Sequence, residues 1–177
     1  MRVLLDFDGV LLDSLGTLEY LIPGFDSSQV DTYDFQGNIG VPREEVFKTL
    51  YSRQYYESVK PYAETKEALD ILRGAGITAI PYTEVPPNPI LMTIRNHTIT
   101  ELGMEGSVHV KTKHGKPLVD GVAAVFEDSP ANLKRWLGRD NVRLYLIDHT
   151  YNRDTNSYIR CKNIKEAVER FLCDVSS

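Results

Sequence analysis

The 177-residue chain contains only two cysteines, Cys161 and Cys173, both near its end. Their spacing matches neither a CxxC redox pair nor a zinc-binding set, so we expect two reduced thiols. The chain also has no apolar run of about 18 residues, the length that a membrane-spanning helix requires. Acids interrupt the N-terminal stretch MRVLLDFDGVLLDS, which makes it unlike a signal peptide. We therefore expect a cytoplasmic protein with no membrane partner.

Positive charge is also scarce. The chain has 20 Lys and Arg residues against 25 Asp and Glu, which gives a formal net charge of −5, and no basic stripe stands out. This balance argues against a protein that binds nucleic-acid polymers. A small anionic substrate is compatible with it, because local charge at a site can oppose the global charge. Hydrophobic residues make up 42% of the chain, which is enough for the core of one folded domain.

Short apolar runs alternate with helical patterns along most of the chain. We expect strands at residues 3–5, 77–82, 107–110, 121–126 and 142–147. We expect helices at residues 64–75, 90–102, 130–137 and 163–172. Strands that alternate with helices predict an α/β fold of the Rossmann-like kind, with a parallel five-stranded sheet and helices on both of its faces.

One segment does not follow this alternation. Residues 15–62 are rich in aromatic side chains and contain the helical pattern VPREEVFKTLYSRQYYESV. We expect a small α-helical cap to be inserted here, after the first strand. Residues 1–14 and 63–177 would then form the core domain.

Polar residues follow several of the expected strands. Asp6 and Asp8 come after the first strand, Thr83 after the second, and Glu127 and Asp128 after the run 121–126. The carboxyl ends of parallel strands meet at one edge of a sheet, where ligands bind. Buried acids need a compensating charge, and Mg2+ prefers carboxylate, water and phosphate oxygens. The pattern therefore predicts a Mg2+ site at this edge.

Each of these residues also has a plain structural explanation. Thr83 fits a hydroxyl at the end of a strand, and Glu127 and Asp128 fit acids at the N-terminus of a helix that Ser129 caps. Asp13 fits the N-cap of the first helix in the insertion. The order of the whole set along the chain, rather than any single member, favours a shared site.

The ordered set resembles the haloacid dehalogenase-like (HAD-like) superfamily of phosphotransferases. The matching stretches are DFDGVLLDS, AIPYTE with Thr83, HGKPLVDG with Lys116, and VFEDSPANL. The resemblance implies that Asp6 is a nucleophile that forms an aspartyl-phosphate. It implies that Asp8 is the general acid and base, which protonates the leaving oxygen and then activates water.

The resemblance also implies roles for the remaining residues. Mg2+ would be bound by Asp6, Asp128, the backbone carbonyl of Asp8 and, directly or through water, Glu127. Thr83 would donate a hydrogen bond to a phosphoryl oxygen. Lys116 would neutralise phosphate charge and hold Asp6, with Lys111 and Lys113 as alternatives for this lysine.

A narrower resemblance is to the 5′(3′)-deoxyribonucleotidase family. It is carried by VDTYDF, by KPYAETKEALDILRGAGITAIPYTEVPP, by VFEDSPANLKRW and by LIDHTYNRDTNSYIRCKNIKEAV. It implies hydrolysis of nucleoside monophosphates beneath a helical cap. Glu84 departs from the family, in which a small residue usually follows the hydroxyl, and it would change the charge of the phosphate pocket.

Four aromatic residues of the insertion are candidates for stacking on a nucleobase, since every base has a π-face. They are Tyr33, Phe35, Tyr55 and Tyr56. They would equally serve as the small core of the insertion itself. The alternative functions are a phosphatase for a sugar phosphate or another small metabolite, and a catalytically silent relative that binds a phosphorylated ligand.

Overall fold

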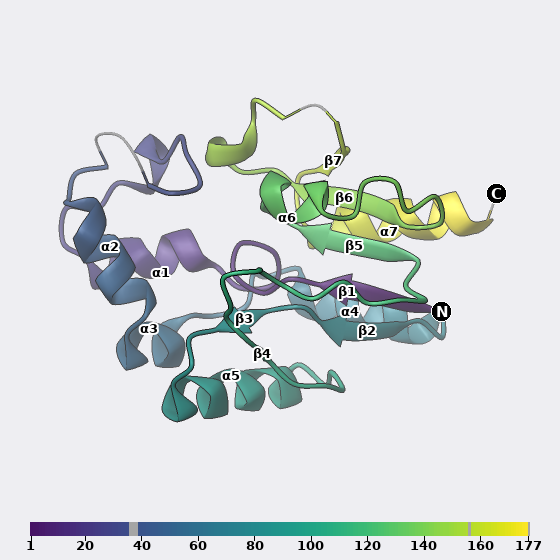
Figure 1. The fold of residues 1–177 in the computed structure, drawn as a ribbon, viewed down its shortest axis with the longest axis horizontal. Coiled ribbons are helices and arrows are strands. Elements are labelled where there is room, and N and C mark those ends of the chain that lie inside the picture. Colours follow the sequence, from purple (N-terminus) through teal and green to yellow (C-terminus); the bar gives the residue numbers. More distant parts are fainter. Residues whose placement is uncertain (36–38, 156, 177) are drawn as a thin grey trace.

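The computed structural model describes residues 1–35, 39–155 and 157–176, and its main feature is a five-stranded parallel sheet (Figure 1). The strand order is β2-β1-β5-β6-β7, and every neighbouring pair is parallel. The strands are β1 (Arg2–Leu5), β2 (Thr78–Pro81), β5 (Ala124–Glu127), β6 (Arg143–Ile147) and β7 (Ile159–Cys161). The expected α/β fold with a parallel five-stranded sheet is confirmed.

One of the five expected strands does not belong to this sheet. The run at 107–110 forms only β4 (His109–Val110), which pairs in parallel with β3 (Glu84–Val85) in a separate two-stranded sheet. The fifth place in the main sheet is taken by β7, which the sequence did not indicate. Its three residues are too few to show a hydrophobic period.

Helices cover both faces of the sheet. They are α4 (Thr65–Gly74), α6 (Pro130–Lys134) and α7 (Ile164–Ser176), whereas α5 (Pro89–Glu101) packs against β3 of the two-stranded sheet. Side chains alternate along β1, so Val3 and Leu5 join the core beneath α4 and α7. Leu4 points to the opposite face, where it packs with Leu133 of α6 and with Trp136. Helix α6 is shorter than expected, since turns replace it after Lys134.

The insertion after β1 folds as helices beside the carboxyl ends of the strands (Figure 1). These helices are α1 (Ser14–Leu21), α2 (Arg43–Leu50) and α3 (Arg53–Ser58), with a short 3-10 helix at Ser27–Gln29. Asp13 caps α1 by accepting from the Gly16 amide at 2.9 Å, as the sequence indicated. The division into a core and a cap domain, with boundaries at residues 15–62, stays a prediction.

The chain leaves and re-enters the core through two adjacent segments. The Asp13 amide donates to the Lys60 carbonyl at 2.9 Å, and the Tyr62 amide donates to the Leu11 carbonyl at 3.0 Å. Both connections therefore lie at the same end of β1. Among the described residues, no helix is long and apolar enough to cross a membrane.

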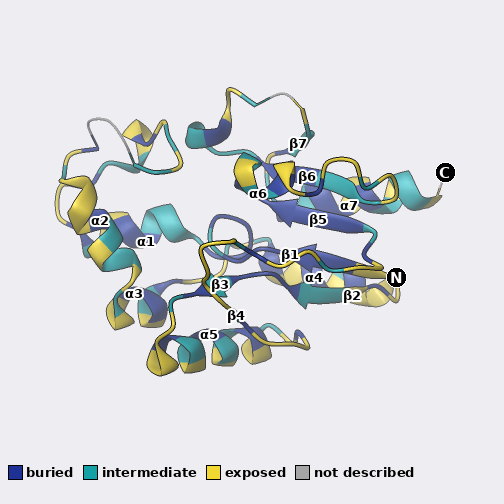
Figure 2. Cartoon of the chain, in the orientation of Figure 1, coloured by how far each residue is buried: buried dark blue, intermediate teal, exposed yellow. Residues whose placement is uncertain are grey.

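The strand order reverses at β1. The chain passes from β1 to β2 on one side, and β5 pairs with β1 on the other. Figure 2 shows that β1 and β5 are largely buried. Ligands bind at such a switch point, beyond the carboxyl ends of the strands. A ligand site is therefore expected at the carboxyl ends of β1 and β5.

Candidate active site

Three buried carboxylates meet at the switch point. Leu5 of β1 is in register with Phe126 of β5, and the Asp6 amide donates to the Phe126 carbonyl at 3.0 Å. This register brings Asp6 beside Glu127 and Asp128. Each of the three acids has a carboxylate oxygen within 4.8 Å of the other two, and none is more than 5% exposed. The sheet thus joins acids that lie about 120 residues apart in the chain.

Lys116 forms ion pairs with two of these acids. Its Nζ lies 2.7 Å from Asp6 Oδ1 and 2.7 Å from Glu127 Oε2, and the lysine is 5% exposed. The Tyr82 ring lies beneath the ammonium, with its centroid at 5.1 Å. Burial alone disfavours the ammonium, but the charges of Asp6 and Glu127 outweigh it and raise the pKa of Lys116. Lys116 therefore stays charged across the physiological range.

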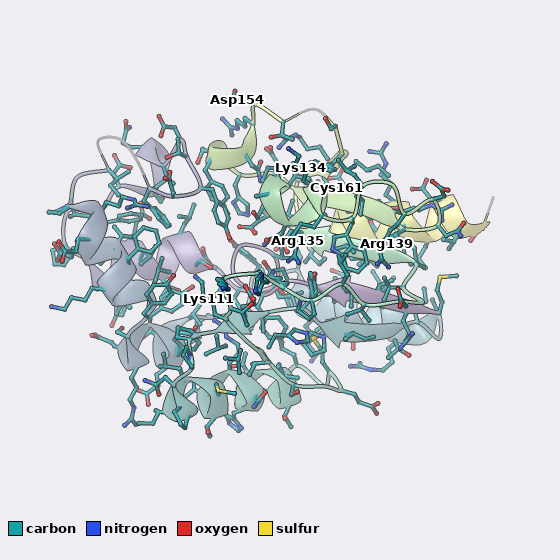
Figure 3. All side chains as sticks on the ribbon, viewed as in Figure 1. Lys111, Lys134, Arg135, Arg139, Asp154 and Cys161 are labelled. Carbon is teal, nitrogen blue, oxygen red and sulfur yellow. The ribbon has the colours of Figure 1, made fainter. Side chains whose placement is uncertain are left out.

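The two other candidate lysines lie elsewhere. Lys111 and Lys113 are exposed. The Lys111 ammonium donates to the Tyr51 hydroxyl of the insertion at 2.7 Å, beyond the end of β4 (Figure 3). Among the three lysines, Lys116 is the one that touches Asp6.

The cluster carries an excess of negative charge. Three carboxylates face one ammonium, which leaves two formal negative charges when every group is ionised. Burial and the charge of Glu127 raise the pKa of Asp6 well above its usual value. Burial and the charge of Asp6 raise the pKa of Asp128 to about 7, although a hydrogen bond from Tyr151 opposes the shift. A divalent cation would balance this excess charge.

The residues present fit a hard cation such as Mg2+. Asp128 Oδ1 is buried and has no hydrogen-bond partner in the described part of the chain. Glu127 is more fully occupied, because it accepts from Lys116, from Asn132 Nδ2 at 3.2 Å and from the Ser129 amide at 3.4 Å. Asp6 and Asp128 are therefore better placed than Glu127 to ligate a metal directly.

The segment after β6 holds Asp128 from the other side. The Tyr151 hydroxyl donates to Asp128 Oδ2 at 2.6 Å, and Asn152 Nδ2 donates to the Asp128 carbonyl at 2.8 Å. The His149 ring stacks on Tyr151 at 4.9 Å between centroids, and its Nε2 lies 2.6 Å from the Gly9 carbonyl. The stretch HTYN thus connects the loop after β1 with the loop after β5.

Gly9 lets the loop after β1 pass close to Asp128. Its φ is +79°, a conformation that side chains disfavour. A Cβ atom here would lie 2.8 Å from the Tyr151 hydroxyl and 2.9 Å from Asp128 Cγ. Only glycine fits this position without displacing the site.

Asp8 lies apart from the three clustered acids and has different partners. Arg95 of α5 donates through Nη2 to Asp8 Oδ1 at 2.9 Å and to Oδ2 at 3.0 Å. The Tyr55 hydroxyl of α3 donates to Oδ1 at 2.8 Å. The Asp8 side chain remains 35% exposed. Its carboxylate is therefore open to solvent on one side and fixed on the other.

Thr83 and Glu84 follow β2 at the same edge. The Tyr82 amide donates to the Leu5 carbonyl at 2.8 Å, so this segment runs beside the end of β1. Thr83 is buried, and its carbonyl accepts from the His109 amide. Glu84 begins β3, and its Oε1 is buried without a hydrogen-bond partner among the described residues. The phosphate-binding roles of both residues stay predictions.

The four aromatic candidates of the insertion differ in their surroundings. Phe35 packs against Phe25 and Phe47, with centroids 6.3 and 5.7 Å away. Tyr55 and Tyr56 are buried. Tyr33 is 50% exposed, and its ring meets Tyr151 edge to face at 5.7 Å. Among the four, Tyr33 is the one with a free ring surface near the acids.

The sequence patterns did not single out Arg95 or Tyr151. Arg95 is the one Lys or Arg in the stretch PILMTIRNHTIT, which is a signal of a buried, paired arginine. Its partner Asp8 lies 87 positions earlier, so the pairing is invisible without the fold. Tyr151 lies in the stretch LIDHTYNRDTNSYIRCKNIKEAV, but nothing in the sequence links it to Asp128.

Neither a family model nor a curated protein sequence matches this chain. Its structure does resemble solved ones. A predicted phosphatase from Clostridium acetobutylicum superposes with a TM-score of 0.61 at 14% identity, over 97% of both chains. A HAD family hydrolase from Deinococcus radiodurans R1, solved with bound phosphate and sodium, gives 0.54 at 19% identity, over 99% of this chain and 96% of that one.

A third similar structure is D,D-heptose 1,7-bisphosphate phosphatase from B. bronchiseptica, complexed with magnesium and phosphate. It gives a TM-score of 0.52 at 11% identity and covers 98% of both chains. At such identities the likeness concerns the fold alone. The fold of this chain is thus the one found in HAD-like hydrolases.

Proposed function

We propose that the protein is a Mg2+-dependent phosphomonoester hydrolase that forms an aspartyl-phosphate on Asp6. The observation that carries this proposal is the buried Asp6 carboxylate, held by Lys116 beside Glu127 and Asp128. The HAD-like fold and the phosphatases among its structural relatives support the same reading.

The contacts of Asp6 suggest which of its oxygens attacks. Oδ1 accepts from the Phe7 amide at 2.7 Å and lies 2.7 Å from the Lys116 ammonium. These two donors fix the carboxylate and occupy Oδ1, so we assign the attack on phosphorus to Oδ2. Lys116 also reduces the repulsion between the nucleophile and an incoming phosphate dianion.

The reaction proceeds in two halves. In the first, Asp6 Oδ2 forms a bond to phosphorus, the bond from phosphorus to the leaving oxygen breaks, and protonated Asp8 gives that oxygen its proton. In the second, water attacks phosphorus and gives a proton to Asp8, and the bond from Asp6 to phosphorus breaks to release inorganic phosphate. Bound Mg2+, ligated by Asp6, Asp128 and the Asp8 carbonyl, would neutralise charge on the phosphoryl oxygens.

Turnover by an Asp6→Asn variant tests the proposal. Wild-type protein with Mg2+ should hydrolyse p-nitrophenyl phosphate, and Asp6→Asn should lose at least about 1,000-fold in kcat, since an amide is a poor nucleophile. Asp140→Asn, the same change at an exposed acid, should retain full turnover. Equal Mg2+-dependent turnover by wild type and Asp6→Asn would show that Asp6 is not the nucleophile.

For the substrate, we propose a (deoxy)nucleoside 5′-monophosphate. Tyr33 supports this choice, because its half-exposed ring lies against Tyr151, which itself binds Asp128. A base stacked on this ring would place its 5′-phosphate towards Asp6.

A sugar phosphate is the second candidate. It is favoured by the similarity to the heptose bisphosphate phosphatase and by Phe35, Tyr55 and Tyr56, which already have partners within the protein. A panel of nucleoside monophosphates and hexose phosphates separates the two substrates. A kcat/KM for any sugar phosphate above that for every nucleotide would overturn the nucleotide proposal.

A further inference from the structure

The partners of Asp8 form an unusual arrangement at the junction of core and insertion. Arg95 is 1% exposed, and one of its nitrogens, Nη2, reaches both carboxylate oxygens of Asp8. Tyr55 approaches from α3 and donates to Oδ1 alone. The Asp8 carboxylate thus accepts hydrogen bonds from α5 and from α3 of the insertion.

Arg95 is itself confined. Its guanidinium lies over the Phe7 ring at 5.6 Å and over the Tyr56 ring at 4.8 Å. Its Nη1 is buried and has no hydrogen-bond partner within the described residues. A buried guanidinium is costly unless an anion compensates it, and Asp8 is the carboxylate that pairs with it here. The packing leaves Arg95 little freedom to serve any other group.

The hydrogen bonds distinguish the two oxygens of Asp8. Among the described residues, Oδ1 accepts from both Tyr55 and Arg95, whereas Oδ2 accepts from Arg95 alone. With the side chain 35% exposed, Oδ2 keeps acceptor capacity for a further partner. It is the atom able to carry a proton to a leaving group or to receive one from water.

We propose that Arg95 is a positioning residue that holds Asp8 for acid–base catalysis with Oδ2 as the working oxygen, and that Tyr55 ties this position to helix α3. The inference rests on the proposed function, in which Asp8 is the acid and base. It adds a residue from α5, outside every stretch that carried the family resemblance to the phosphotransferases. Arg95 does not touch substrate; it acts through the orientation of Asp8.

The dependence of rate on the leaving group provides the test. General acid catalysis matters for a poor leaving group and little for a good one. We compare kcat/KM for phenyl phosphate and 2,4-dinitrophenyl phosphate, because this constant reports the steps up to aspartyl-phosphate formation. Arg95→Lys keeps the charge but replaces the guanidinium that lies over the Phe7 and Tyr56 rings with a shorter ammonium. It should lose about 10- to 100-fold on phenyl phosphate and less than about 3-fold on the dinitrophenyl ester.

Two matched controls accompany this comparison. Arg73→Lys changes an exposed arginine that pairs with Asp70 on α4, and it should leave kcat/KM for both substrates unchanged. Tyr55→Phe is a test variant that removes only the hydroxyl that donates to Asp8, and it should lower kcat/KM for phenyl phosphate selectively. Tyr51→Phe removes a tyrosine hydroxyl of the insertion that contacts Lys111 instead, and it should not change the ratio.

A double mutant separates this proposal from the proposed function. If Arg95 acts through Asp8, Arg95→Lys should add no further loss on phenyl phosphate in an Asp8→Asn background. The positioning role would be overturned if Arg95→Lys and Tyr55→Phe each lost activity equally on both substrates and Asp8→Asn still showed selectivity for the leaving group. Asp8→Asn without such selectivity would instead contradict the acid role of Asp8. If Arg95→Lys does not fold, Tyr55→Phe alone decides the matter.

Discussion

At the scale of single residues, the buried carboxylate of Asp128 affects the stability of the protein through its charge. Asp128 is buried, accepts one hydrogen bond on Oδ2 and leaves Oδ1 without a partner in the described structure. Such a carboxylate lowers the stability of the protein unless a cation binds it. The acids therefore oppose folding of the metal-free chain and favour metal binding.

The difference in stability between the wild type and Asp128→Asn should therefore depend on pH. Burial and Asp6 raise the pKa of Asp128 from 3.8 to about 7, so the folded protein retains a proton that the unfolded chain releases above about pH 4. The stability of metal-free protein therefore falls as the pH rises from about 4 to 7 and stays low above that range. In EDTA at pH 8, Asp128→Asn should be more stable by roughly 2–4 kcal/mol, with little difference at pH 4.

Thermal unfolding of both proteins measures this effect. Saturating Mg2+ at pH 8 should raise the Tm of the wild type and leave that of Asp128→Asn unchanged, because the variant lacks a ligand. A variant that is destabilised equally at both pH values in EDTA would contradict the account.

Gly9→Ala should damage the site through geometry rather than charge. The added Cβ meets Tyr151 and Asp128 at a φ of +79°. We expect a loss of roughly 1–3 kcal/mol in stability and at least about 100-fold in kcat. The control is Gly74→Ala at the end of α4, where nothing lies within 4 Å, and it should be neutral or stabilising by up to about 1 kcal/mol. Equal, small effects of both changes would show that the loop does not need glycine.

The residues of the site were partly predictable from the sequence. Asp6, Glu127 and Asp128 follow apolar runs whose ends must meet in a parallel sheet, and the structure brings them together. Arg95 and Tyr151 were missed because each contacts its acid only after the chain has folded. A single sequence records which side chains are polar but not which distant ones face each other.

Elements are joined at the site by the short segment after β6. Asn152 is buried and uses its side chain fully: Nδ2 donates to the carbonyls of Asp128 and Ile147, and Oδ1 accepts from His149 and Arg160. This amide links β5, β6 and the segment that leads to β7. A network in which every donor and acceptor is used is costly to interrupt.

Asn152→Ala should therefore destabilise the protein by about 2–4 kcal/mol, because buried donors and acceptors lose their partner. It should also lower kcat, since the Asp128 backbone loses its donor. Asn163→Ala removes one hydrogen bond, to the Glu166 amide, at the start of α7 and should cost about 1 kcal/mol with no change in kcat. Denaturant unfolding and steady-state kinetics of both variants measure the difference; equal losses would refute the special role of Asn152.

Element boundaries were predictable where the apolar pattern was long. The expected helices near α4, α5 and α7 are all present, as are the strands β1, β2, β5 and β6. The errors fell on short elements. His109–Val110 pairs outside the main sheet, β7 was missed, and α6 ends at Lys134. Two to five residues carry too little periodicity to decide such cases.

The molecule as a whole brings the site together at the reversal of the strand order. Asp6 follows β1, Glu127 ends β5, and the insertion reaches Asp8 through Tyr55. The alternation of strands and helices was enough to predict this α/β arrangement. The packing of the insertion was not predictable, because its aromatics suit both a core and a binding surface.

Ligand-induced stabilisation tests the assembled site. Mg2+ with beryllium fluoride, a phosphoryl mimic that binds a carboxylate, should raise the Tm of the wild type by several degrees. Asp6→Asn should show no such shift, while the exposed Asp140→Asn should behave as wild type. An unchanged Tm for the wild type would mean that the site does not bind metal and phosphoryl group together.

The most direct test of the central claim is a search for the phosphorylated enzyme. Wild-type protein is mixed with substrate and Mg2+, quenched in acid and analysed by peptide mass spectrometry. We predict a phosphoryl group on Asp6 that hydroxylamine removes and that is absent from Asp6→Asn. A protein that turns over substrate with no phosphoryl group on Asp6, or one that remains phosphorylated after Asp6→Asn, would contradict the account.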